Sequence, residues 1–118
     1  MAKKRVAVII DHSPLNTTRA SEGLRMALGQ TLADNQVRVL LLDAGAWAAI
    51  PLKPAAVSGG DFKKPIDTII MLKHEVWVEE ESLQELGIDR AQVLPGIKLA
   101  SRRQVEQELA EAEAVIRF

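Results

Sequence analysis

Two apolar, β-branched runs constrain the fold of this chain most. Residues 5–10 read RVAVII, and residues 36–42 read QVRVLLL. Strands this rich in apolar residues are typical of a parallel sheet that is covered on both faces. The stretch between them, RASEGLRMALGQTLAD, repeats apolar residues every three or four positions, as an amphipathic helix does. The three segments therefore predict a βαβ unit with a right-handed crossover.

The rest of the chain continues this alternation. The helix predicted over residues 17–33 has a buried stripe of small and aliphatic side chains: Ala20, Leu24, Ala27, Leu28 and Leu32. Further strands are predicted at residues 75–78, 97–100 and 114–118, and further helices at 65–72, 80–87 and 102–112. Residues 43–65 read as a long loop, which in a compact domain is more often functional than neutral. The whole pattern predicts one α/β domain over residues 1–118, a three-layer sandwich around a five-stranded, mainly parallel sheet.

Composition excludes several classes of function. A net charge of −1 over 118 residues gives no general attraction to nucleic acid or to an anionic membrane, so neither is an expected partner. The absence of cysteine excludes disulfides, thiolate metal sites and thiol chemistry within the chain. Neither dinucleotide-binding nor P-loop glycine motifs occur, and no cofactor or metal is predicted. With no targeting signal and no run long enough to span a bilayer, a cytoplasmic location is expected.

Three polar loops follow the first three predicted strands, at residues 11–18, 43–47 and 79–82. The carboxyl ends of parallel strands meet at one edge of the sheet, which is the usual ligand site of this architecture. The first loop leads into a helix N-terminus, where free amide groups favour an anion. Candidate anion-binding residues are therefore Ser13, Asn16, Thr17, Thr18 and Arg19. The alternative for this loop is a capped helix with solvated polar side chains.

The only histidines are His12 and His74, and both are interpreted as structural or surface residues. His12 with Asp11 has the composition of a base and an orienting carboxylate. Neighbouring residues of an extended segment point to opposite sides, however, so Asp11 is not expected to reach the His12 ring. A hydrolase that uses Asp11, His12 and Glu79 is the least favoured hypothesis.

Three consecutive glutamates, Glu79, Glu80 and Glu81, stand between the third predicted strand and a helix. Carboxylates at a helix N-terminus interact favourably with its dipole, by about 0.3–1 kcal/mol each. Consecutive helical positions diverge, so a pair of catalytic carboxylates facing one cavity is not predicted. The three residues are interpreted as helix-stabilising charges.

The order of these segments resembles the DsrE/DsrF/TusC-like sulfur-relay family. The marks of that family are a proline-containing loop, an R-A-x-E-x-L-x-x-A-L helix, and a strand that ends in an acidic residue and a glycine. Here they correspond to Arg19, Ala20, Glu22, Leu24, Leu28, Asp43 and Gly45. The second half is similar through VWVEEESLQELGI, LPGIKLAS and a terminal strand that ends in Phe118.

The resemblance implies a small α/β domain that assembles into trimers or hexamers, from identical or related subunits. Active members of the family pass persulfide sulfur between protein cysteines, and their cysteine lies about where this chain has Glu79. A carboxylate cannot carry a sulfane sulfur. The chain is therefore interpreted as a non-catalytic subunit of a sulfur relay, partnered by itself (as a homotrimer or homohexamer) or by cysteine-bearing relatives. The alternative is a stand-alone homo-oligomeric module that binds a small anion at residues 13–18.

The region of residues 44–72 is predicted to form the subunit interface. It holds more large apolar side chains than one stripe of a short helix can bury, so part of it should face outward. The predicted interface residues are Trp47, Ile50, Ile69 and Ile70. Trp47 is the expected anchor, because tryptophan is enriched among interface hot spots.

Overall fold

A computed structural model describes residues 4–15, 18–51 and 63–118. Each β-strand is followed by a helical segment until β5, and the strands fall where the apolar runs predict them. In chain order the elements are β1 (Arg5–Ile10), α1 (Arg19–Leu32), β2 (Gln36–Leu41), the 3₁₀ helix η1 (Asp43–Ala49), α2 (Lys63–Met71), β3 (Glu75–Glu79), α3 (Glu80–Leu86), the 3₁₀ helix η3 (Arg90–Gln92), β4 (Lys98–Ala100), α4 (Arg102–Glu111) and β5 (Ala114–Arg117).

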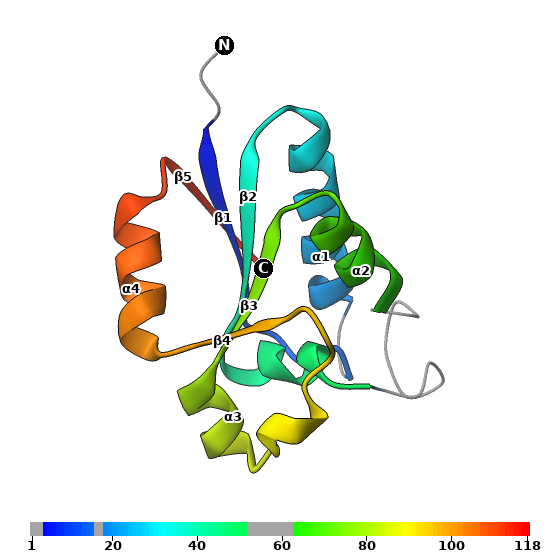
Figure 1. Ribbon diagram of the computed structural model, residues 1–118, viewed down its shortest axis with the longest axis vertical. Helices are drawn as coiled ribbons and strands as arrows, with labels where there is room; N and C mark the ends of the chain where they lie inside the picture. The colour runs from blue at the N-terminus through cyan, green and yellow to red at the C-terminus, as the bar shows by residue number, and fades with distance from the viewer. Residues whose placement is uncertain (1–3, 16–17, 52–62) are drawn as a thin grey trace.

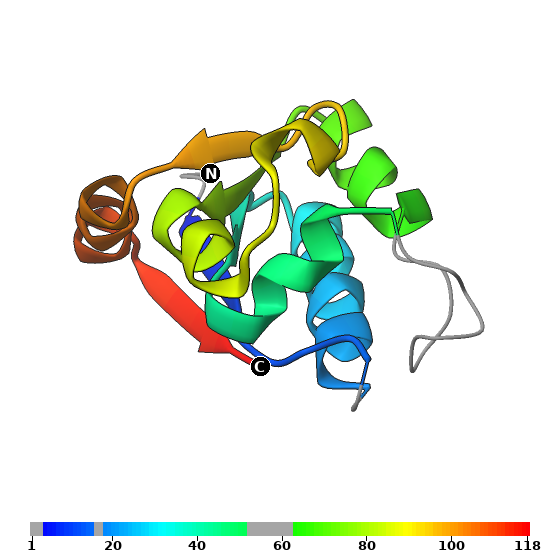
Figure 2. The ribbon, with the colours of Figure 1, turned by 90° about the horizontal axis from the view of Figure 1, so that it is seen from below.

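The five strands form one sheet in the order β4-β3-β2-β1-β5, and all four pairings are parallel. Helices α1 and α2 cover one face of this sheet and α4 covers the other (Figure 1). Helix α3 and the two 3₁₀ helices lie at the edge where β1, β2 and β3 end (Figures 1 and 2). The predicted three-layer α/β sandwich with a five-stranded sheet is confirmed.

The two faces of the sheet bury two apolar clusters of unequal size. Because side chains alternate along a strand, Val6, Val8 and Ile10 of β1 face α1 and α2, whereas Ala7 and Ile9 face α4. The cluster under α1 and α2 is the larger one and also takes the aliphatic residues of β2 and β3. The sheet is thus apolar on both faces, as its continuous apolar runs predict.

The predicted stripe of α1 is wrong at its last position. Ala20, Leu24 and Ala27 are fully buried and Leu28 packs against the core, but Leu32 is 87% exposed. Each four-residue step turns a helix by about 40° more than one full turn, so a stripe built on such steps rotates away from the sheet. Leu32 is the last residue of α1 and has rotated into solvent.

Charged side chains lie between α4 and the sheet near the beginnings of the strands β1, β2 and β3. Glu108 of α4 is only 7% exposed, and its carboxylate contacts Arg38 at 2.6 Å and Arg5 at 3.3 Å. Arg38 also pairs with Glu75 at 2.6 Å and stacks on the Trp77 ring, 4.6 Å from the ring centroid. The buried carboxylate of Glu108 is therefore compensated by two guanidinium groups, and α4 is held to the sheet by charge as well as by apolar contact.

Stability should fall in acid partly through Glu75. The indole N–H of Trp77, followed by the charge and hydrogen bond of Arg38 and the charge of Lys98, holds the pKa of Glu75 below its ordinary value despite partial burial. A lowered pKa in the folded state stabilises the protein above the ordinary carboxyl pKa, and this contribution is lost as pH falls through the folded value. Urea unfolding at about pH 6 and about pH 3 should therefore show a smaller loss of stability for Glu75→Gln than for the wild type. Glu106→Gln, at an exposed position of α4, is the control, and equal losses in all three proteins would refute this role of Glu75.

Candidate functional site

The three predicted polar loops do meet at the carboxyl edge of the sheet. The amide of Asp43, which follows β2, donates to the Ser82 hydroxyl in α3 at 2.8 Å. The amide of Leu42 donates to the carbonyl of Ile10 at 3.0 Å, which joins the loops after β1 and β2. Asp43 has a φ of 49°, a left-handed backbone conformation that is uncommon for a residue with a side chain. The convergence that the sequence predicts is confirmed.

Glu79, the last residue of β3, lies at this edge and is buried, with 4% exposure. Its Oε1 atom accepts a hydrogen bond from the Ser82 hydroxyl at 2.8 Å and two from the Arg102 guanidinium, at 2.9 Å and 3.3 Å. A continuous chain of hydrogen bonds thus runs from the Asp43 amide through Ser82 to Glu79. Hydrogen bonds to Glu79 and then to Glu85 raise the pKa of Arg102 above its ordinary value.

The side chain of Glu79 contacts groups other than the free amides of α3, and whether its charge also stabilises that helix stays a prediction. Glu79 is the N-cap residue of α3, yet its side chain makes no capping hydrogen bond. As the last residue of β3 it points to the same face as Glu75 and Trp77, which is the face that α4 covers. Its carboxylate therefore meets Arg102 of α4 instead of the free amides of α3.

The glutamates that follow have partners of their own. Both carboxylate oxygens of Glu81 accept from the backbone amide of Arg102, at 2.9 Å and 3.0 Å. Glu80 lies 3.7 Å from the guanidinium of Arg90, and Glu85 lies 3.1 Å from that of Arg102. Glu79 thus holds the start of α4 to the end of β3, and Glu81 and Glu85 hold it to α3. The sequence contains no short-range signal for this, because Arg102 follows Glu79 by 23 residues.

Two of the predicted anion-binding residues of the first loop, Ser13 and Thr18, form hydrogen bonds with residues close to them in sequence. Ser13 accepts from the amide of Leu15 at 3.1 Å, and Thr18 is the N-cap of α1 but makes no side-chain cap. The Thr18 hydroxyl donates to Glu22 at 3.2 Å, which places a carboxylate beside this helix end. Arg19 is exposed. Asn16 and Thr17 lie outside the described residues, and anion binding by this loop stays a prediction.

The expectation that Asp11 cannot reach His12 is wrong. The His12 Nδ1 atom lies 3.0 Å from Asp11 Oδ1, because β1 ends at Ile10 and the chain bends at His12. The two atoms are close but not hydrogen-bonded, because Asp11 Oδ1 has no hydrogen-bond partner among the described residues. The other oxygen, Oδ2, accepts from Arg117 Nε at 2.7 Å. Glu79 bonds to Ser82 and Arg102 instead, so the three residues of the hydrolase hypothesis do not act on one group.

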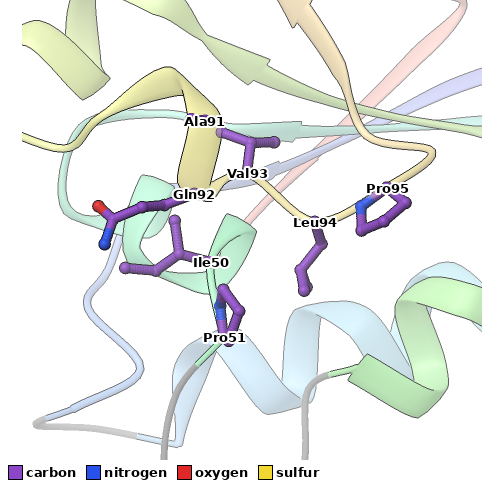
Figure 3. A pocket seen from close by; sticks show the side chains of 7 residues that line it. All are labelled: Ile50, Pro51, Ala91, Gln92, Val93, Leu94 and Pro95. Carbon is purple, nitrogen blue, oxygen red and sulfur yellow. The ribbon is translucent and has the colours of Figure 1, made fainter.

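The predicted interface residues divide into a buried one and three closer to the surface. Ile69 is fully buried, because the inward stripe of α2 is formed by Ile66 and Ile69, so its assignment to an interface is wrong. Trp47 and Ile70 are partly buried against the core. Ile50 lines a shallow groove of about 420 Å³ between the end of η1 and residues 91–95, as Figure 3 shows.

The described ranges contain no group of three or more histidine or acidic side chains that could hold a metal ion. No helix within these ranges has the length and hydropathy needed to cross a membrane.

The chain is similar to known proteins in both sequence and fold. The model of the DsrE/DsrF-like family matches residues 4–118. The fold is similar to the crystal structure of the ychN protein from E. coli, with a TM-score of 0.83 and 18% identity over 99% of this chain and 100% of that one. It is also similar to the protein of unknown function MTH1491 from Methanobacterium thermoautotrophicum, with a TM-score of 0.76 and 16% identity over 98% of this chain and 100% of that one. At these identities the likeness shows the fold. No curated protein gives a significant match.

Proposed function

Because this chain belongs to the DsrE/DsrF-like family, we propose that it is a non-catalytic subunit of a cytoplasmic sulfur relay. It takes part through contacts with other subunits and carries no sulfur itself. The proposal joins the family assignment to the chemistry of one position, Glu79.

The buried, hydrogen-bonded carboxylate of Glu79 carries this proposal. In persulfide transfer an acceptor thiolate attacks the outer sulfur, a new S–S bond forms, the old one breaks, and the donor leaves as a thiolate. The chain has no cysteine to act as acceptor. The resemblance assigns the family cysteine to the position of Glu79, where this chain has a side chain that ties β3 to α4 through Arg102. The site that would hold sulfur thus has a structural role.

The proposed partners are cysteine-bearing relatives or further copies of this chain, in a trimer or hexamer. The region that we assign to this contact includes Ile50, in the groove beside residues 91–95, and the partly buried Trp47. Met71 and Leu72 at the end of α2 are 73% and 47% exposed and add apolar surface. Apolar side chains with a polar surround are the usual anchors of such contacts.

Affinity purification of the tagged chain from its native host tests the proposal. We expect mass spectrometry to identify a cysteine-bearing subunit of the same family, and Ile50→Glu to remove it from the purified material. Leu32→Glu is the matched control, because Leu32 is an exposed apolar residue outside the proposed contact. Recovery of the chain without any family subunit would contradict the hetero-oligomeric form of the proposal.

A labelled-sulfur assay tests the absence of a carrier role. When the co-purified subunit is charged with radioactive sulfane sulfur, the label should stay on that subunit and none should become bound to the wild-type chain. The Glu79→Cys variant supplies a thiol at the family position and shows whether the assay can detect transfer. Covalent label on the wild-type chain would overturn the proposal.

A further inference from the structure

The end of β1 carries a buried carboxylate with one unsatisfied oxygen. Asp11 follows β1 directly, and its side chain is only 9% exposed. The Arg117 guanidinium holds the Oδ2 atom, at 2.7 Å from Nε and 2.6 Å from Nη2. The Oδ1 atom is buried and has no hydrogen-bond partner among the described residues. An unpaired buried oxygen is costly, and a bound ion is one of the reasons for which such groups are retained.

The imidazole of His12 lies against this oxygen without pairing with it. The His12 Nδ1 atom is 3.0 Å from Asp11 Oδ1, a distance that suits a hydrogen bond. Because Oδ1 accepts no hydrogen bond, the ring N–H direction must miss the line that joins the two atoms. The nitrogen and the oxygen are therefore two Lewis bases that could bind one electrophile placed beside that line.

The distance between these two atoms fits a metal chelate. Two ligand atoms at adjacent corners of an octahedron, each about 2.1 Å from the metal, lie about 3.0 Å apart. At the corners of a tetrahedron with the same bond length they would lie about 3.4 Å apart. The 3.0 Å between Nδ1 and Oδ1 thus corresponds to neighbouring positions around a six-coordinate ion.

The surroundings of the pair select the kind of ion. An imidazole nitrogen beside a carboxylate oxygen suits first-row transition metals, whereas Mg²⁺ and Ca²⁺ prefer oxygen alone. The His12 side chain is 46% exposed, so the ring can turn to admit an ion and leaves its remaining positions to water. Arg117 orients Asp11 through the outer oxygen, as second-shell partners of ligating carboxylates do. No third histidine or acidic side chain of the described ranges completes the set.

We propose that Asp11 and His12 form a binding site for one divalent transition-metal ion in six-fold coordination. Asp11 Oδ1 and His12 Nδ1 are the two protein ligands, and water supplies the others. The site lies at the carboxyl edge of the sheet, where the chain leaves β1 and bends at His12. It is independent of the sulfur-relay proposal, because it needs neither a thiol nor a second subunit.

Titration of the purified chain, without an affinity tag, with Ni²⁺ in a calorimeter tests the site. We expect saturable binding of one ion per chain. His12→Gln and Asp11→Asn should each weaken binding by at least about tenfold, since the loss of even a second-shell partner costs about 10–100-fold. His74→Gln is the matched control and should bind as the wild type does. His74 is the only other histidine, and its Nδ1 atom already accepts from the Val37 amide at 3.0 Å.

Proton NMR of the two histidine rings locates the ion. Paramagnetic Ni²⁺ at less than one equivalent should broaden the signals of His12 and leave those of His74 sharp. His74 precedes β3 and therefore lies at the opposite end of the parallel sheet. Broadening of both rings to the same extent would show that the ion has no preference for His12 and would overturn the proposal.

The variants decide the remaining outcomes. One-site binding that both ligand variants lose and His74→Gln retains would support the proposal, provided that circular dichroism shows the variants folded. If Asp11→Asn did not fold, His12→Gln would decide alone, because the His12 ring is half exposed. A wild type without saturable Ni²⁺ binding, or an unchanged affinity in His12→Gln, would overturn it. Displacement of Ni²⁺ by an equal concentration of Mg²⁺ would also overturn it, because the imidazole would then not be a ligand.

Discussion

Gly45→Ala should destabilise the protein by about 3 kcal/mol or more, because there is no room for a side chain at this position. A Cβ atom at Gly45 would overlap the carbonyl oxygen of Ile10 and lie 2.6 Å from the carbonyl carbon. Those atoms belong to β1, which is held on both sides by β2 and β5 and cannot move aside. Urea unfolding followed by far-UV circular dichroism measures the loss.

The matched control for this variant is Gly29→Ala. Gly29 lies in α1 with open space around it, so alanine there should stabilise the protein by about 0.5–1 kcal/mol through its higher helix propensity. The same chemical change thus has opposite signs at the two positions. Overpacking costs at least about 1 kcal/mol. If the free energy of unfolding of Gly45→Ala were closer than this to the wild-type value, η1 would be able to shift away from β1.

Glu79→Ala should cost about 2 kcal/mol, far more than a charge at a helix end contributes. The substitution leaves the proton of the fully buried Ser82 hydroxyl without its acceptor and opens a void between β3 and α4. Glu79→Gln keeps the volume and an acceptor oxygen but loses the charge that faces Arg102, so about 1 kcal/mol is expected.

Chemical denaturation of both Glu79 variants, with Glu80→Ala for comparison, distinguishes stabilisation by hydrogen bonds to Ser82 and Arg102 from stabilisation by the helix dipole. Glu80 stands in the first turn of α3 with only a 3.7 Å contact to Arg90, and its loss should cost about 0.5 kcal/mol or less. If Glu79→Ala proved no more damaging than Glu80→Ala, the hydrogen bonds to Ser82 and Arg102 would have no net effect. The helix-dipole interpretation would then be sufficient.

The elements of the fold could be predicted because their signals are local. The apolar runs of β1 and β2 and the three- and four-residue spacing in α1 depend only on neighbouring residues. The 3₁₀ helix η1 was not predicted, since its sequence DAGAWAA has neither a helical nor a strand period. Its small residues are buried by close contact with α3, β2 and β3, and Gly45 lies against Ile10 of β1, which no local pattern reveals.

The candidate site could be predicted only in position. The end of β3 follows from the sequence, but the role of Glu79 depends on Arg102, which follows it by 23 residues. In the same way the partner of Asp11 is Arg117, at the other end of the chain. Whether Ile69 or Ile70 faces outward depends on how α2 is rotated against the sheet, and a short apolar run does not fix that rotation. Long-range contacts therefore separate what the sequence predicts from what it does not.

The pairing of β5 with β1 has a consequence for how the protein is made. Residues 114–117 complete the sheet beside residues 6–9, so one of its four strand pairings joins segments more than one hundred residues apart in sequence. Contacts of such separation slow folding, because a large loop must close before they form. During translation β1 to β4 leave the ribosome while one side of β1 is still unpaired, and that side is a hazard for aggregation until the last strand emerges.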